Sequence, residues 1–209
     1  MSRPTPKGRT ATKQETREAL VAAGLAEFAE HGLDAPSLDS ICARAGFTRG
    51  AFYVHFRDRE EFLESVMEQV FVSLLDTLIA TGGGAGDLEE TVERFTAAAA
   101  VAAGPKALRL PAFSMDIHRV LDACARSPKL RKRFVALMTG GAERVAAAVA
   151  SGQQAGSIRV DVDAAVLGRI LTILAFGVLT AIDTGVPVDL GPARDAVLRL
   201  LAPSDPRRP

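Results

Sequence analysis

Apolar residues recur every three or four positions along most of this chain, which is the spacing of one face of an α-helix. Near the N-terminus, Leu20, Gly24 and Phe28 follow one another at this interval. β-Branched residues do not gather into the bounded alternating runs that mark β-strands. The pattern therefore predicts an all-α fold.

Capping residues divide the N-terminal part of this pattern into separate helices. Thr12 and Glu15 have the spacing of a capping box, so the first helix is expected to begin there. Gly46 can adopt the left-handed conformation that ends a helix, and Thr48 can cap the next helix two residues later. The predicted helices span residues 12–31, 37–45, 48–56 and 59–79.

A glycine-rich stretch at residues 82–86 interrupts the pattern, and the helical segments after it are longer and richer in alanine. The functional division is placed near Phe62, since helix 59–79 is expected to bridge the two parts of the chain. Further helices are expected at about 87–103, 105–126, 128–152, 161–184 and 191–202. The predicted parts are a flexible basic arm (1–11), a small three-helix domain (12–61), a larger helical bundle (62–203) and a disordered tail (204–209).

Composition narrows the classes of function. Lys plus Arg and Asp plus Glu number 25 each, so the net charge gives no argument for nucleic-acid binding. Cys42 and Cys124 lack the spacing of metal ligands, so no metal, cofactor or disulfide framework is expected. The longest strongly apolar segment, 170–182, is too short to span a bilayer, and the N-terminus lacks the apolar segment of a signal peptide. We therefore expect a cytoplasmic protein without a membrane partner.

Cationic residues gather in two places along the N-terminal part of the chain. The first group is Arg3, Lys7, Arg9, Lys13 and Arg17, and the second is Arg44, Arg49, Arg57 and Arg59. Charge runs by themselves favour a solvated surface and a disordered tail. The motif that these cations flank changes this interpretation.

That motif is the segment SLDSICARAGFTRGAFYVHFRDREEF, residues 37–62. It predicts two short helices joined by a tight turn at Gly46, which is the arrangement that a helix-turn-helix needs to brace a helix in the major groove of DNA. The sequence AGFTRGAFYVHF, followed by DRE and preceded by EFAEHG, resembles the TetR (tetracycline-repressor) family over about residues 14–68. Cys42, Phe47 and Arg59 depart from the residues usual in that family, which are alanine, valine and lysine.

The resemblance implies which residues contact DNA. Groove-facing positions fall on Arg49, Gly50 and Ala51, and phosphate-contacting positions fall on Ser37, Thr48, Tyr53, His55 and Arg59. Arg49 can donate two hydrogen bonds to O6 and N7 of guanine, and the small residues after it let the helix approach the base edges. Asp39 has two interpretations: it accepts from cytosine N4, or it only complements the dipole of its helix.

The resemblance also implies that the larger bundle binds a small-molecule effector and that the chain is a homodimeric repressor of a palindromic double-stranded DNA operator, released by that effector. The expected pocket residues are Phe113, Met115, Asp116, His118, Phe134 and Met138, although bulky groups of this kind also occur as ordinary core. The all-round apolar segment 166–182 places the dimer interface on the helices at about 161–184 and 191–202. Two other classes stay open: an enzyme using Asp116, His118 and Asp122, and a helical protein-interaction module.

Overall fold

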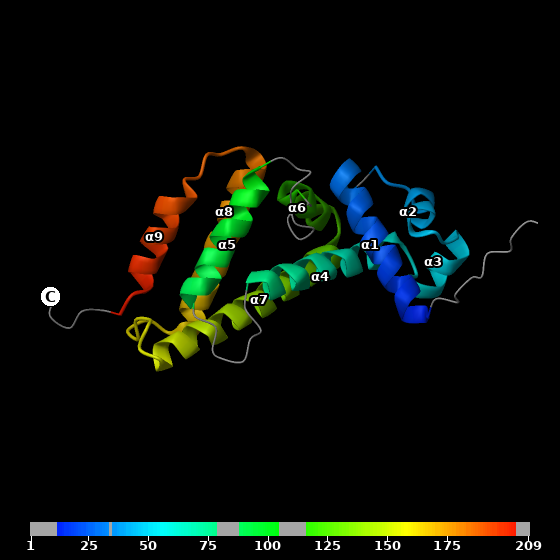
Figure 1. Ribbon diagram of the computed structural model, residues 1–209. Helices are drawn as coiled ribbons and strands as arrows, with labels where there is room; N and C mark the ends of the chain where they lie inside the picture. The colour runs from blue at the N-terminus through cyan, green and yellow to red at the C-terminus, as the bar shows by residue number, and fades with distance from the viewer. Residues whose placement is uncertain (1–11, 34, 79–87, 105–115, 204–209) are drawn as a thin grey trace, which may run out of the picture. The chain divides into compact units, whose positions relative to one another are not determined.

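The computed structural model describes residues 12–33, 35–78, 88–104 and 116–203, and α-helices are the only regular elements in these ranges (Figure 1). They are α1 (Lys13–His31), α2 (Leu38–Ala45), α3 (Arg49–His55), α4 (Arg59–Leu78), α5 (Leu88–Ala103), α6 (Ile117–Arg126), α7 (Pro128–Gln154), α8 (Ala164–Thr184) and α9 (Leu190–Leu201). The predicted all-α fold is confirmed. The predictions for the arm, the tail, the glycine-rich stretch and residues 105–115 of one helix fall outside the described residues.

The chain divides into two compact units, residues 1–66 (unit 1) and 67–209 (unit 2). The division lies within α4, a few residues after Phe62.

The helix ends in unit 1 lie at the capping residues that the sequence predicts. The Thr12 hydroxyl accepts from the Glu15 amide at 3.2 Å, and the Glu15 carboxylate accepts from the Thr12 amide at 2.7 Å, so the capping box is complete. Ser37 and Thr48 cap α2 and α3 in the same manner. Gly46 ends α2 with φ of 75°, a left-handed conformation that favours glycine.

Phenylalanine rings form the core of unit 1. Phe52, Phe56 and Phe62 have centroids 5.0–5.2 Å apart and are almost completely buried. Phe28 of α1 lies 6.1 Å from Phe62. A Cβ at Gly24 would overlap the Phe62 ring, so glycine at this position allows α1 to approach α4.

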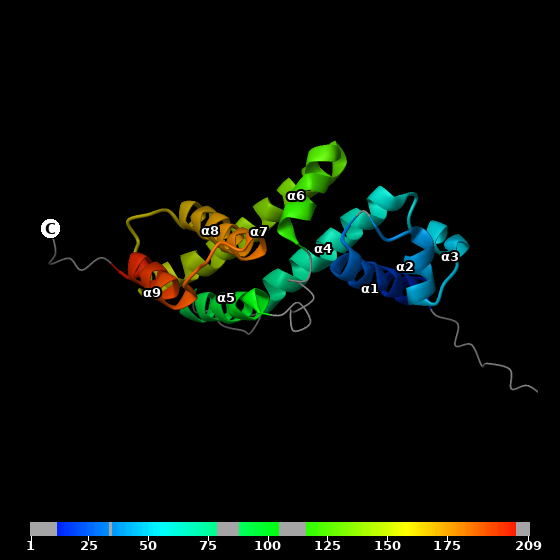
Figure 2. The same cartoon turned by 90° about the horizontal axis from the view of Figure 1, so that it is seen from above.

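Small residues allow close helix packing in unit 2. α7 and α8 lie side by side (Figures 1 and 2), and a Cβ added to Gly168 of α8 would come within 2.7 Å of the backbone of Ala146 on α7. α5 lies beside α9 and turns alanines of the run 97–103 inward, with Ala99 fully buried. The interpretation of that run as a mark of close packing agrees with this arrangement.

The start of α8 differs from the prediction. We expected the helix to begin near Asp161, but it begins at Ala164 with Asp163 as the N-cap. The Asp163 carboxylate accepts from the amides of Ala165 and Val166 at 2.9 and 3.1 Å. Asp161 is instead paired with Arg159, so its carboxylate is not available for capping.

The apolar segment of α8 is longer than the sequence analysis assumed. α8 has 21 residues and a stretch of mean hydropathy 2.1, and both α8 and α7 are long and apolar enough to cross a membrane by length and composition. The argument from insufficient length is therefore wrong for this helix. Core helices of soluble proteins pass the same test, but only 11% of the apolar stretch of α8 is buried within the chain. α8 thus presents apolar surface that its own chain does not cover.

Candidate nucleic-acid interface and ligand cavity

α2 and α3 are joined by a tight turn that places them as a helix-turn-helix. The amide of Phe47 donates to the Cys42 carbonyl at 2.9 Å across this turn. Phe52 is the buried residue of α3, and it packs among the other phenylalanine rings of unit 1. The opposite face of α3 is open, with Tyr53 and Val54 54% and 63% exposed. The recognition helix is therefore anchored on one face and free on the other, as a groove-reading helix must be.

The predicted groove-facing residues lie at the first turn of α3. Arg49 and Gly50 are exposed, and Ala51 is half-buried. A Cβ at Gly50 would meet only the Thr48 hydroxyl, at 3.6 Å, so packing within the chain does not demand glycine there. The Arg49 guanidinium is paired with Asp39 of α2, with 2.6 Å between Nε and Oδ1.

The predicted phosphate-contacting residues have different surroundings. The Ser37 and Thr48 hydroxyls accept from the amides of Ser40 and Ala51, and each keeps its own hydrogen to donate. The exposed Tyr53 ring packs edge-on against Phe52, with centroids 5.5 Å apart. The ring is therefore held on one side, while about half of the residue stays exposed.

His55 and Arg59 belong to the same predicted set. Burial, and then the positive charges of Lys13 and Arg17, hold the pKa of His55 below its usual 6.5. The Arg59 guanidinium donates to the carbonyls of Leu33 and Pro36, each at 2.6 Å, and lies 5.6 Å from the centroid of the Phe28 ring. Arg59 thus fastens the connection between α1 and α2, and its contact with phosphate stays a prediction.

Sequence reasoning missed that several cations of the second group are paired within the chain. Arg44 of α2 donates to Glu27 and Glu30 of α1, and these bonds raise the pKa of Arg44 and lower that of Glu30. Arg57 is paired with Glu61 at 2.9 Å. The positive charge available to DNA is therefore smaller than the count of cations suggests. The partners of Arg44 are 17 and 14 residues away in sequence and leave no local signal, whereas the i,i+4 spacing of Arg57 and Glu61 is a signal that could have shown their pair.

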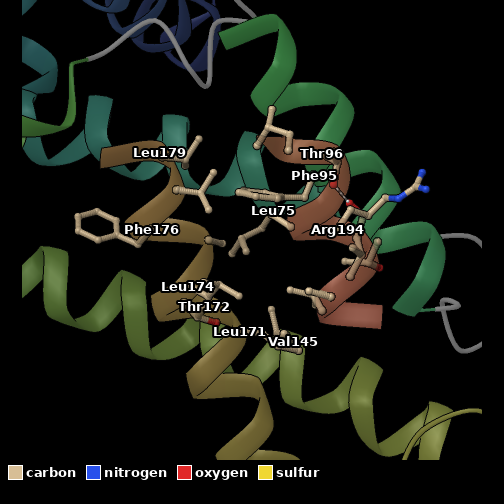
Figure 3. A pocket seen from close by; sticks show the side chains of 18 of the residues that line it. Leu75, Phe95, Thr96, Val145, Leu171, Thr172, Leu174, Phe176, Leu179 and Arg194 are labelled. Carbon is tan, nitrogen blue, oxygen red and sulfur yellow. Dashed lines mark hydrogen bonds between the residues drawn. The ribbon is translucent and has the colours of Figure 1, made fainter. Parts of the chain in front are cut away.

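Unit 2 holds a cavity of about 400 Å³ between α4, α5, α7, α8 and α9 (Figure 3). Most of its wall is aliphatic or aromatic, with Leu75, Phe95, Leu171 and Phe176 among the residues around it. A cavity of this volume is in the range that small organic ligands occupy.

The wall has few polar residues, and three of the four, Thr96, Thr172 and Arg194 but not Thr91, have a hydrogen bond within the chain. The hydroxyls of Thr96 and Thr172 donate to carbonyls of their own helices at 2.7 and 2.8 Å. Arg194 is paired with Asp195, and Figure 3 shows its guanidinium directed away from the cavity. Together with the apolar wall, this arrangement suits an uncharged, apolar ligand.

The structure gathers the predicted effector residues only in part. Met138 lines the cavity. The ring centroid of Phe134 lies 5.8 Å from that of Phe176, and Phe176 is part of the cavity wall. Asp116 is paired with Arg119, and His118 is paired with Asp183 through Nδ1 at 2.7 Å, and neither is among the residues lining this cavity. Phe113 and Met115 lie outside the described residues. α8 and α9 also form walls of the cavity, although their apolar faces were expected only at a dimer interface.

The residues of the alternative metal enzyme are not brought together. Asp116, His118 and Asp122 are paired with three different partners, Arg119, Asp183 and Arg126. Over the described ranges, a group with ligand atoms within 4.8 Å of one another is formed instead by Glu27, Glu30 and His31. Arg44 binds both of these carboxylates, which explains the group without an ion.

An anchored and solvent-facing α3, a braced turn and an apolar cavity in a second helical unit define a helix-turn-helix regulator of transcription. Residues 20–66 match the family described as bacterial regulatory proteins, tetR family. This match covers the helix-turn-helix part, and over most of its length the chain is similar to TetR-family transcriptional regulators, a class of DNA-binding proteins.

Individual relatives divide into local and extended matches. The transcriptional regulator SrpR of Pseudomonas putida is 40% identical over 57 residues, 27% of each chain. The regulator UidR of Escherichia coli strain K12 is 25% identical over 170 residues, which cover 81% of this chain and 83% of UidR. The structure of the SmeT–triclosan complex is 26% identical, covers 93% of this chain and 98% of SmeT, and superposes with a TM-score of 0.68. SmeT is described as the repressor of a multidrug efflux pump of Stenotrophomonas maltophilia.

Proposed function

We propose that this protein is a cytoplasmic repressor that binds a palindromic operator as a homodimer and releases it when a small molecule occupies unit 2. The observation that carries the proposal is the exposed face of α3, which is held in place from behind by the buried ring of Phe52. Rigid support of a reading helix is what base recognition needs, because the donor atoms must be fixed relative to the groove.

The DNA contacts divide between base reading and backbone binding. Arg49 reads a guanine, while Gly50 and Ala51 allow α3 to approach the bases. The hydroxyl, imidazole and guanidinium groups of Ser37, Thr48, Tyr53, His55 and Arg59 bind phosphate and set the register.

Unbiased selection of DNA sequences bound by the full chain tests this division. We expect Arg49→Ala to relax one position in each half-site, at about 1–3 kcal/mol per lost bidentate contact. Tyr53→Phe should weaken all sequences alike. Arg126→Ala, which removes a cation of unit 2, is the charge-matched control. Equal weakening of every operator variant by Arg49→Ala would contradict the base-reading role.

The apolar stripe of α8 is the proposed dimer interface. Val166, Ile170 and Ile173 are exposed at spacings of four and three residues, which is one face of a helix. Leu174 of α8 and Leu200 of α9 are also exposed, at the edge where they line the cavity as well. A second copy of the chain is the occupant that function requires, because a two-fold dimer presents two recognition helices to the two halves of a palindrome.

Sedimentation at micromolar concentration tests the interface. Ile173→Arg should give monomers, because it places a charge in the centre of the stripe. Val160→Arg changes another exposed apolar residue outside α8 and should leave the dimer intact. A well-folded monomer of the unmodified chain would overturn the proposal.

The cavity of unit 2 is the proposed effector site. Its apolar wall favours uncharged ligands, and SmeT, a relative in sequence and fold, forms a complex with triclosan. Phe71 and Leu75 of α4 belong to the wall, and α4 begins in unit 1, so a shift of this helix could reach the DNA-reading helices. The ligand must favour one state of the dimer, since equal affinity for both states shifts nothing.

Calorimetry with and without operator DNA tests the regulation, using a compound from a screen of apolar molecules that includes triclosan. A tenfold change in operator affinity corresponds to about 1.4 kcal/mol of coupling and requires the same tenfold change in ligand affinity. Ala175→Phe fills the cavity and should abolish ligand binding, whereas Ala136→Phe, an exposed site on α7, should not. Identical ligand affinity in both titrations would contradict the regulatory role.

A further inference from the structure

The charged pair on the DNA-reading face is formed by Arg49, at the first position of α3, and Asp39, in the first turn of α2. The Arg49 Nε lies 2.6 Å from the Asp39 Oδ1. Both side chains are exposed, at 55% and 69%. An ion pair in such contact with water contributes little to folding. Its position at the first turn of the recognition helix gives it another use.

We infer that Asp39 is a specificity-determining residue, because its carboxylate orients Arg49 for guanine. This inference rests on the proposed base-reading role of Arg49. It differs from a direct contact of Asp39 with cytosine and from a purely local effect on α2.

The atoms of the contact carry the inference. A guanidinium has five N–H donors in a fixed plane, and Asp39 engages the one on Nε. The two terminal amino groups, Nη1 and Nη2, form the opposite edge of that plane. This edge is the fork that donates to O6 and N7 of guanine. A carboxylate on Nε therefore fixes the plane of the group without occupying the donors that read the base.

The two helices hold the partners of this pair rigidly. Thr48 caps α3 directly before Arg49, and Ser37 caps α2 two residues before Asp39. The turn at Gly46 fixes the distance between the two helix starts. Arg49 therefore loses less conformational freedom when DNA binds, and preorganisation of this kind raises the affinity of the correct contact.

Asp39 should also lower the affinity for DNA that lacks the guanine. Its negative charge lies on the face that meets phosphate, so it repels any DNA to some extent. The two hydrogen bonds from Arg49 to a matching guanine offset this repulsion, whereas a mismatched base accepts no such pair of bonds. Orientation and repulsion then act in the same direction, toward discrimination.

The test is a double-mutant cycle on the full chain, with the operator found by selection and its variants at the base that Arg49→Ala relaxes. Asp39→Asn keeps the size of the side chain and removes its charge. We expect it to lower the preference for guanine at that base by about fivefold, the lower end for a bidentate contact. Affinity for DNA without the guanine should stay equal or rise. In the Arg49→Ala background, Asp39→Asn should leave base preference unchanged.

Glu18→Gln is the matched control, because Glu18 is an exposed carboxylate of α1 that is bonded to Gln14 and not to Arg49. It should leave base preference unchanged. Fluorescence of Tyr53, the single tyrosine in a chain without tryptophan, reports whether unit 1 of each variant is folded.

Three results would overturn the inference. Asp39→Asn could leave the guanine preference unchanged, it could sharpen that preference, or it could alter base preference in the Arg49→Ala background as well. The last result would mean that Asp39 reads a base itself. Failure of the chain to select any DNA would instead contradict the proposed function, so the two failures are distinguishable.

Discussion

The internal packing of unit 1 and that of unit 2 depend on different kinds of side chain. Unit 1 has a small core of phenylalanine rings, centred on Phe52, and its helix ends are fixed by side-chain caps. Unit 2 relies on close approach of helices at small residues such as Gly168, and it keeps an open cavity and an uncovered apolar helix. The core of unit 1 is completely packed, whereas unit 2 keeps an internal cavity and an exposed apolar helix face.

The sequence relationships follow the same division. The match to SrpR is 40% over 57 residues, whereas the match to UidR, which extends over 170 residues, is 25%. The major groove of B-DNA has similar dimensions for every protein that binds it. The helices that support a recognition helix must therefore fit the same geometry in all relatives. A ligand cavity has no such common template, and its walls can vary while the helical fold stays.

The largest effect is expected from Phe52→Ala in unit 1. Removing a fully buried ring from the centre of the aromatic core should lower the free energy of unfolding by about 3–5 kcal/mol and abolish operator binding. Urea unfolding followed by Tyr53 fluorescence measures this loss in unit 1 alone, since no other tyrosine or tryptophan is present.

Leu171→Ala provides the comparison in unit 2. Leu171 lines the cavity and is only half-buried, so part of its surroundings is empty before the substitution. Leu171→Ala should therefore lower the free energy of unfolding by less than Phe52→Ala does. Equal losses would mean that unit 2 is packed as tightly as unit 1, and the contrast between the units would fail.

Local features of the sequence predicted unit 1 in detail. Thr12, Ser37 and Thr48 were recognised as caps, because a capping residue acts on amides only two or three positions away. Gly46 was recognised as a turn for the same reason. The ion pairs of Arg44 and the carbonyl bonds of Arg59 were not predicted, since their partners are 14 to 26 residues away in sequence.

The sequence predicted less of unit 2 than of unit 1. α8 is apolar on nearly all sides, so periodicity cannot tell which side faces a cavity and which side faces a second chain. Leu171 faces the cavity and Ile173 is exposed, although they are two residues apart on equally apolar faces. The expected pocket combines bulky groups on two successive helices with Asp116 and His118 as the polar contributors. Both are instead engaged in ion pairs.

Gly168→Ala tests the close packing of unit 2. The new methyl group would lie 2.7 Å from backbone atoms of Ala146, and a backbone cannot move aside as a side chain can. Overpacking of this kind should destabilise unit 2 by about 1–3 kcal/mol. Far-ultraviolet circular dichroism during thermal unfolding measures the change.

Gly140→Ala is the matched control on α7. Nothing lies within 4 Å of an added Cβ at Gly140, so the substitution should stabilise the helix by about 0.5–1 kcal/mol. The two substitutions should therefore have opposite signs. Stabilisation of the same size at both positions would indicate that helix propensity, and not contact with Ala146, determines the result.

His55 should make operator binding depend on pH. The pKa of His55 lies below its usual 6.5, so the imidazole of the free protein is neutral at pH 7. Contact with phosphate favours the protonated form, and binding should then take up a proton. Operator affinity should rise as the pH falls below 7, by at most about tenfold per pH unit for each His55.

His55→Gln should remove this dependence at constant ionic strength, while His31 and His118 remain. The stability of unit 1 should change in the opposite direction. A lowered histidine pKa means that the unfolded chain binds more protons, so this contribution to stability is present above about pH 6.5 and is lost as the pH falls. Unchanged pH dependence in His55→Gln would show that another group takes up the proton.

The smallest effects are expected from two exposed ion pairs, one in each unit. The Arg44 guanidinium lowers the pKa of Glu30 in unit 1, and the Arg159 guanidinium lowers the pKa of Asp161 in unit 2. A carboxylate with a lowered pKa stabilises the folded state above its unfolded pKa, which is about 4.5 for Glu30 and 3.8 for Asp161. This contribution is lost as the pH falls through the lower, folded pKa.

Glu30→Gln should therefore lower the stability of unit 1 slightly at pH 6 and make no difference well below the folded pKa of Glu30. Asp161→Asn should act in the same way on unit 2. Both differences should shrink in high salt, because exposed charges are screened. Urea midpoints at pH 6 and pH 3 measure them, with Tyr53 fluorescence for unit 1 and circular dichroism for both units. A difference that grew as the pH fell would reverse the sign of the argument. An effect of Glu30→Gln on the circular dichroism transition of unit 2 would mean that the two units do not unfold separately.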